Sequence, residues 1–184
     1  MLTRKYSVAT ALAATAVIAG TTLGTAAPAS AATATQCKTS SKTFSLPSKP
    51  DVKVNATICI QRYAVSGGYR YYKAWLSKVS WDGTSWFTGG KRFNDISVLA
   101  RAEHGTTVVR NCAYGICEWN SLTSLINNSE SGSKTFQSGS GGYGIAWVKT
   151  KSPNWLADAT VSWDVADDGK ATTSWDLADT AAVY

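Results

Sequence analysis

Apolar and polar residues alternate along much of this chain, which is the pattern of a half-buried β-strand. The alternation is clearest in VKVNATICI at 52–60 and in FNDISVLARAE at 93–103. Two further runs, YRYYKAWLSKVSW at 69–81 and IAWVK at 145–149, are rich in the aromatic and β-branched residues that favour strands. Glycine-containing turns separate the runs. The pattern predicts an all-β fold, a single antiparallel β-sandwich of about eight strands.

Two stretches depart from this alternation. Residues 32–50, ATATQCKTSSKTFSLPSKP, are polar and hold two prolines, so we expect an N-terminal arm with one short strand at most. The sandwich domain is then 51–184. In EWNSLTSLINN, at 118–128, the apolar residues have helical spacing, which predicts a helical turn or a short helix.

The stretch VSWDVADDGKATTSWDLAD, at 161–179, holds two Ser-Trp-Asp triplets around a glycine, as the two arms of a hairpin would. A three-residue loop, 168–170, with Gly169 at positive φ sets Trp163 opposite Trp175, both facing inward. Asp164 and Asp176 then lie on the outer face. There they either bind a calcium ion or a basic partner, or form a solvated surface that discourages edge pairing.

The N-terminus has the features of a secretory signal peptide. Arg4 and Lys5 precede an apolar run that ends near Gly24, and Ala29-Ser30-Ala31 fits a cleavage site. Cleavage after residue 31 leaves a mature chain of 184 − 31 = 153 residues. No second apolar run is long enough to span a bilayer, so we expect a secreted, extracellular protein.

Four cysteines in an exported chain predict two disulfides, for which three pairings exist. Cys112 and Cys117 enclose only AYGI, in which Tyr114-Gly115 can turn, so we pair them with each other. Cys37 then bonds Cys59 and fixes the arm to the first strand. A zinc site is disfavoured, because the chain has one histidine and no second close cysteine pair.

Charge is unevenly distributed along the mature chain. Residues 32–152 carry 15 basic and 6 acidic side chains, whereas residues 153–184 carry 1 basic and 6 acidic. The asymmetry predicts a bipolar surface with an acidic end. The positive charge is moderate and no nucleic-acid-binding motif is present, so nucleic acid is not expected as a partner.

No catalytic signature is present. The one histidine, His104, falls in a predicted turn beside Gly105, and no serine lies in a Gly-x-Ser-x-Gly elbow. Asp95, Glu103 and Glu118 are the carboxylates that could converge for glycoside hydrolysis, although scattered acids on strands are more often surface groups. The sequence predicts no enzyme activity, no cofactor and no metal.

Aromatic residues crowd into 69–86, around Arg70, Lys73 and Lys78. Alternation cannot bury all of them on one face: Tyr69, Tyr71, Trp75 and Trp81 share one parity, and Tyr72 has the other. Either some of this aromatic surface is exposed and binds a protein or a sugar, or a central strand is covered on both faces. The candidate partner-binding residues are Tyr69, Tyr71, Tyr72, Trp75, Tyr114, Asp164 and Asp176.

Three binding functions fit these features. The first is an adaptor that holds another secreted protein, with the arm fixed by Cys37–Cys59 adding a strand to the edge of a partner's sheet. The second is a lectin-like, carbohydrate-binding module. The third is a protease inhibitor, for which the loop between Cys112 and Cys117 offers Tyr114 and Ile116.

The Ala/Thr-rich leader, the arm ATATQCKTSSKTF, the paired cysteines and the run FNDISVLARAEHGTTVVRNCAYGIC resemble the small secreted β-sandwich proteins of filamentous, high-GC bacteria. More narrowly, the chain is similar to the adaptor subunit of umbrella toxin particles. The resemblance covers most of the mature chain and rests on no specific motif. It implies a non-catalytic adaptor that uses its N-terminal arm to join a lectin-bearing subunit to a stalked antibacterial toxin. It assigns no role to any single residue.

Overall fold

The computed structural model describes residues 33–83, 90–109, 118–119, 122–137 and 144–184. These residues belong to one unit, which spans Ala31–Tyr184. The predicted signal peptide, the predicted Cys112–Cys117 disulfide and Tyr114 lie outside the described residues and stay predictions. Within the described ranges, no helix is long and apolar enough to cross a membrane.

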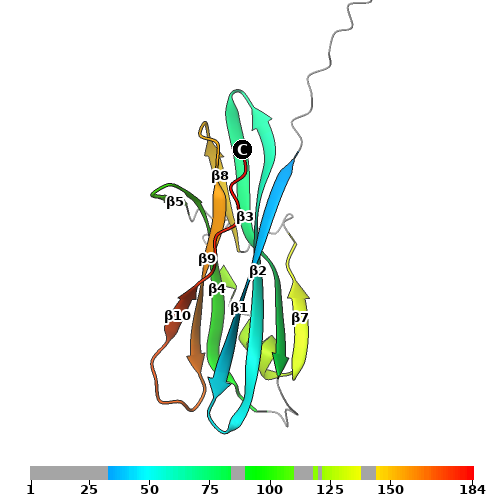
Figure 1. Cartoon of the computed structure of the whole chain (residues 1–184), viewed down its shortest axis with the longest axis vertical. Coiled ribbons are helices and arrows are strands. Elements are labelled where there is room, and N and C mark those ends of the chain that lie inside the picture. The colour runs from blue at the N-terminus through cyan, green and yellow to red at the C-terminus, as the bar shows by residue number, and fades with distance from the viewer. Residues whose placement is uncertain (1–32, 84–89, 110–117, 120–121, 138–143) are drawn as a thin grey trace, which may run out of the picture. The chain divides into compact units, whose positions relative to one another are not determined.

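Two antiparallel sheets make up the described fold (Figure 1). The first sheet has the order β1-β2-β3, and its five strands are β1 (Ala34–Leu46), β2 (Lys49–Ser66), β3 (Tyr69–Gly83), β7 (Ser131–Thr135) and β8 (Ile145–Thr150). Both β7 and β8 pair with β3, β7 along 78–82 and β8 along 70–75. β1 is therefore the edge strand on the other side of this sheet.

The second sheet centres on β4, which pairs with β9 on one side and with β5 and β6 on the other. Its five strands are β10 (Thr173–Asp176), β9 (Leu156–Val165), β4 (Phe93–His104), β5 (Thr107–Val109) and β6 (Glu118–Trp119). The predicted all-β architecture is confirmed. The alternation indicates only about eight strands because β6 has two residues and β7, SGSKT, is polar throughout.

The core fills the space between the two sheets. The alternating residues that the sequence places on one face of 52–60 and of 93–103 are all buried, which confirms both strands: Val52, Val54, Ala56, Ile58, Ile60, Ile96, Val98, Ala100 and Ala102. Facing them, β9 contributes Val161 and Trp163, and β1 contributes Phe44. The Phe44 and Trp163 rings meet edge to face at 5.2 Å, which joins the first sheet to the second.

A β-bulge at Ser77 reverses the side to which β3 side chains point. At this residue β3 holds one more residue than the matching stretch of β2. Because side chains alternate with period two, the extra residue turns Trp81 into the main core, whereas Trp75 belongs to a separate cluster on the outer face. The expectation that Trp75 and Trp81 share a face is therefore wrong.

The expected N-terminal arm is an edge strand for most of its length. β1 has thirteen residues and pairs with β2 from Ala34 opposite Arg62 to Leu46 opposite Lys49. The polar composition of this segment reflects an exposed edge strand, most of whose side chains face solvent. The predicted disulfide Cys37–Cys59 is present and joins two residues that lie directly opposite each other.

The hairpin of β9 and β10 has the predicted inward faces but a different register. Trp163 lies opposite Thr173 and Trp175 opposite Val161, so the pairing is shifted by two residues from the expected one. A longer loop, 166–172, replaces the three-residue loop, with Asp167 as well as Gly169 at positive φ. A shift of two preserves the side-chain parity, so the alternation alone cannot detect it.

The C-terminal segment continues along the edge of the second sheet beyond β10. The N–H groups of Leu177 and Thr180 donate to the carbonyls of Ala159 and Ala157 on β9. Figure 1 shows this segment in red running from β10 to the chain end, and there Arg62 of β2 donates to the Tyr184 carbonyl. The segment therefore links the edges of the two sheets.

The predicted short helix is α1 (Leu122–Asn127), which packs Leu122 and Ile126 into the core. Asn127 fixes the start of β4, because its Oδ1 accepts from the N–H groups of Arg92 and Phe93 at 2.8 and 3.0 Å. The buried Arg92 side chain donates in turn to carbonyls at the end of α1 and just beyond it.

Candidate binding surface

The outer face of the first sheet carries a group of aromatic and lysine side chains where β2, β3 and β8 run side by side. β3 presents alternate residues from 69 to 75 to this face, and β8 sets Trp147 opposite Lys73 and Lys149 opposite Tyr71. We call it the aromatic–lysine face; its members are Tyr63, Tyr69, Tyr71, Lys73, Trp75, Trp147, Lys149 and Lys151.

The aromatic rings of this face contact one another across the strands. The Tyr63 ring lies 6.0 Å from that of Tyr71 and meets Trp147 edge to face at 5.4 Å. Tyr63 stands at a bulge in β2, between Arg62 and Ala64. Tyr63 and Tyr69 remain 36% and 37% exposed, so part of the ring surface is open to a ligand.

The three lysines lie over these rings. The Lys149 ammonium is 4.9 Å from the Tyr69 ring centre and that of Lys151 is 5.3 Å from the same ring. Lys73 stands between Tyr63 and Trp75, at 5.8 and 5.5 Å. Cation–π contacts of this kind hold each ammonium group against an apolar surface.

A small apolar cluster adjoins these rings on the same outer face of the sheet. Cys59, Trp75 and Ile145 are buried together, with Trp147 packed against them, and they form a cluster separate from the main core. Cys59 is also bonded to Cys37, so β1 is covalently joined to β2 beside the face. The aromatic rings are therefore presented by a rigid platform.

Burial shifts the pKa values of two groups on this face. Partial burial lowers the pKa of the Lys73 ammonium below its usual 10.5. Burial, and then the neighbouring Tyr71, raises the pKa of the Tyr63 phenol above 10.0. Both shifts have the same cause, the exclusion of water, and electrostatic attraction to a partner is stronger where water is excluded.

The stretches of β2, β3 and β8 that build this face contain no carboxylate, because Asp51 of β2 and Asp82 of β3 stand at the other end of the sheet. Residues 52–81 and 131–157 include no aspartate or glutamate, and these ranges cover most of β2 and β3 and all of β7 and β8. Acidic side chains gather instead on the outer face of the second sheet, on β4, β9 and β10. The predicted bipolar surface therefore corresponds to the two outer faces of the sandwich.

Of the candidate residues from the sequence, the structure brings Tyr69, Tyr71 and Trp75 together on the aromatic–lysine face. Tyr72 has to be removed from the set. Its side chain is fully buried in the core, because β3 points it in the opposite direction from Tyr71. Burial also raises its pKa.

Sequence reasoning missed half of the face: Tyr63, Trp147, Lys149 and Lys151. The alternation in IAWVK indicates that Trp147 and Lys149 share a side. No local signal shows that β8, some seventy residues later in the chain, pairs with β3. Tyr63 reaches the face through a bulge, which the pattern does not show.

The acidic candidates Asp164 and Asp176 do not meet. Asp176 lies opposite Thr160, four residues from Asp164 on β9, which is about 13 Å along a strand. Asp164 accepts from Asn94 at 3.2 Å, and Asp176 accepts from Thr160 at 2.7 Å. Among the described residues, no group of His, Cys, Asp and Glu side chains is placed to hold a metal ion.

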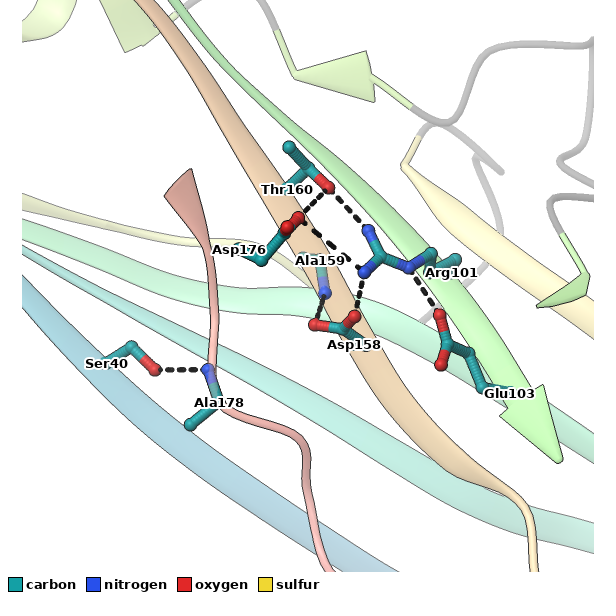
Figure 2. A network of polar contacts seen from close by, with 8 residues as sticks. All are labelled: Ser40, Arg101, Glu103, Asp158, Ala159, Thr160, Asp176 and Ala178. Atoms are coloured by element: carbon teal, nitrogen blue, oxygen red, sulfur yellow. Dashed lines mark hydrogen bonds and ion pairs between the residues drawn. The ribbon is translucent and has the colours of Figure 1, made fainter. Parts of the chain in front are cut away.

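Asp176 belongs to a polar network on the outer face of the second sheet, shown in Figure 2. Arg101 of β4 is at its centre and donates to Asp158, Glu103 and Thr160. Asp176 lies 3.7 Å from the same guanidinium. The Arg101 and Asp158 side chains are only 11% and 7% exposed, so this network holds β4, β9 and β10 together as a structural element.

The carboxylates considered for catalysis are not brought together. Asp95 and Glu103 lie eight residues apart on β4, about 26 Å, and Glu103 pairs with Arg101. His104 stacks on Trp155, with ring centres 5.5 Å apart. Asp95 lies directly opposite another carboxylate, Asp164 of β9, and accepts from the Thr123 hydroxyl at 3.2 Å.

No protein-family model matches the chain, and neither a curated protein nor a solved structure shows significant similarity to it.

Proposed function

We propose that this chain is a non-catalytic, exported binding protein that holds another protein through the aromatic–lysine face. The observation that carries the proposal is the composition of that face: partly exposed tyrosines, three lysines stacked on rings, and no carboxylate in the surrounding stretches 52–81 and 131–157. Aromatic residues dominate the energetics of protein interfaces, and tyrosine is among the residues enriched there.

The partner surface is acidic. Three ammonium groups gathered where the neighbouring stretches 52–81 and 131–157 hold no carboxylate attract a negatively charged surface and orient its approach. The acidic outer face of the second sheet points away from such a partner, which would favour one mode of docking over the other. The resemblance to the adaptor of umbrella toxin particles suggests the more specific form of the proposal, an adaptor that links subunits of a secreted antibacterial toxin complex.

A carbohydrate-binding module is the second candidate. The observation in its favour is the open ring surface of Tyr63 and Tyr69, because sugars also stack on exposed aromatic rings. A polysaccharide would depend on those rings and much less on the lysines. The protease-inhibitor alternative depends on the loop between Cys112 and Cys117, outside the described residues.

Two charge-reversal variants test the proposed function. In one, Lys149→Glu and Lys151→Glu reverse the charge of the aromatic–lysine face. In the other, Lys53→Glu and Lys134→Glu make the same change in charge at exposed lysines elsewhere on the first sheet. Each protein is immobilised, exposed to culture supernatant of the producing organism, and the retained proteins are identified by mass spectrometry.

We expect the unmodified protein and the Lys53/Lys134 variant to retain the same acidic protein and the Lys149/Lys151 variant to lose it. Equal loss in both variants would indicate attraction by net charge alone. Undiminished capture by the Lys149/Lys151 variant would place the partner on another surface and refute the proposal. Retention on an insoluble polysaccharide that is lost in Tyr69→Ser, and not in the lysine variants, would favour the carbohydrate-binding module.

A further inference from the structure

The sandwich is open on the side where the two edge strands β1 and β10 face each other. The C-terminal segment crosses this side where the Ala178 N–H donates to Ser40 Oγ at 2.9 Å. Closer to the β9–β10 loop lies a groove of about 340 Å³. It lies between β1 and the β9–β10 hairpin, and its lining residues are Lys42, Thr43, Phe44, Ser45, Trp163, Val165, Asp168, Lys170, Ala171 and Thr173.

One wall of this groove is the backbone edge of β1. Its four lining residues there, 42–45, are consecutive, whereas the side chains of a strand alternate between two faces. An exposed strand edge lines a groove with consecutive residues in this way, and an irregularity in the β1 pairing between Phe44 and Leu46 adds Ser45. Among the described segments, β2 alone pairs with β1, so the backbone groups on the far edge of 41–45 form no ladder with another strand. Such an edge can accept an added strand.

The groove also holds a cation that lacks a carboxylate partner among the described residues. The Lys42 ammonium lies over the Trp163 ring at 4.8 Å, and 5.8 and 5.9 Å from the Trp175 and Phe44 rings. The ion pairs of the described residues do not include Lys42. A positive group held among rings beside an open edge selects for a negative group on whatever occupies the groove.

We propose that residues 41–45 of β1 accept a short extended segment of a partner chain, in which an acidic side chain stands two residues from an apolar one. In strand addition, alternate side chains of the added segment point into the groove. The acidic one lies beside Lys42 and the apolar one beside Phe44, because these two β1 residues point inward and are themselves two apart.

A second copy of this chain is a poor occupant of the groove. Its β1 carries Lys38 and Lys42, and would bring further positive charge into a groove whose charged residues are two lysines, Lys42 and Lys170, and one carboxylate, Asp168. Inward-pointing lysines on edge strands are a common means of preventing self-association. Lys42 therefore opposes pairing between copies and favours an acidic segment from another protein, whose contact lies away from the aromatic–lysine face.

The probe that tests this inference is a blocked pentapeptide, Thr-Glu-Thr-Leu-Thr, added to the isotopically labelled mature protein and followed by NMR. We expect shifts of the amide signals of residues 41–45. The isomer Thr-Glu-Leu-Thr-Thr should bind at least about threefold more weakly, because its two side chains leave the strand on opposite faces. Two further versions of the pentapeptide, each N-methylated at one of the two alternate sets of residues, should differ strongly in affinity. Only one of these sets carries the backbone N–H groups that face β1.

Matched lysine variants identify the cation. Lys42→Gln should weaken binding of the probe about threefold or more, whereas Lys38→Gln, on the same strand but outside the groove, should leave it unchanged. Thermal unfolding of both variants shows that they are folded. The inference is overturned if the pentapeptide does not shift residues 41–45, if both isomers and both N-methylated forms bind equally, or if Lys42→Gln and Lys38→Gln have the same effect.

Discussion

Replacing Arg101 by methionine is expected to destabilise the fold more than any exposed-charge substitution. The change removes the guanidinium that pairs with Asp158, Glu103 and Asp176, and keeps an unbranched side chain of similar length. Asp158 is 7% exposed and would keep one hydrogen bond, from the Ala159 N–H at 2.6 Å. Breaking a buried ion pair by removing one partner costs about 3–5 kcal/mol, because the remaining charge stays buried.

For a chain of this size, such a loss lowers the melting temperature by about 6–20 °C. The assay is urea unfolding followed by tryptophan fluorescence, with thermal unfolding as a second measure. Asp167→Asn is the matched control, because it removes an ion pair with Lys49 whose carboxylate is 79% exposed, and it should cost less than about 1 kcal/mol.

Adding Asp158→Asn to Arg101→Met removes the uncompensated charge and should recover part of the loss. The interaction term of this double-mutant cycle measures the coupling between the two side chains. A loss for Arg101→Met no larger than that of Asp167→Asn would show that the network of Figure 2 carries no net stability, and would refute this reasoning.

Three further predictions concern the core, the disulfide and a pH dependence. Trp163→Ala should cost about 3–5 kcal/mol in urea unfolding and the half-buried Trp175→Ala clearly less; equal losses would contradict the observed register. Replacing Cys37 and Cys59 by alanine should cost about 3 kcal/mol, and an unchanged urea midpoint would show that the bond contributes nothing. Burial in the folded state lowers the pKa of Lys73, so folding disfavours its charged ammonium group. Lys73→Met removes this cost and should therefore be more stable than the unmodified protein at neutral pH, by a margin that shrinks as the pH rises toward 10.5. A margin independent of pH would contradict this.

The sequence predicted those parts of the fold that depend on side-chain parity. Alternation along 52–60 and 93–103 reports directly which side chains are buried, and both faces are confirmed. The inward faces of the β9–β10 hairpin are also as expected. Its register is not, because a shift of two residues leaves every side chain on the same face and only the loop geometry distinguishes the two pairings.

Parity fails where a bulge interrupts it. The extra residue at Ser77 places Trp75 and Trp81 on opposite sides of the sheet, and a second bulge brings Tyr63 to the aromatic–lysine face. Composition misleads in a related way along β1, where a polar segment pairs as an edge strand rather than extending as an arm. Edge strands bury few side chains, so the alternation that identifies a strand is weak there.

The candidate surface could be predicted only in the part that lies on one strand. Tyr69, Tyr71 and Trp75 share a parity and stand together in the structure. Trp147 and Lys149 join them through the pairing of β3 with β8, a contact between segments some seventy residues apart that local sequence does not encode.

The central claim is that the aromatic–lysine face is the surface that holds the partner. Lysine acetylation footprinting of the captured complex tests it most directly. Free and partner-bound protein are briefly acetylated, and the labelling of each lysine is compared by mass spectrometry. The account predicts that Lys149 and Lys151 are protected in the complex, whereas Lys53 and Lys134 are labelled as in the free protein. Unchanged labelling of Lys149 and Lys151, with protection at Lys53 or Lys134, would contradict it.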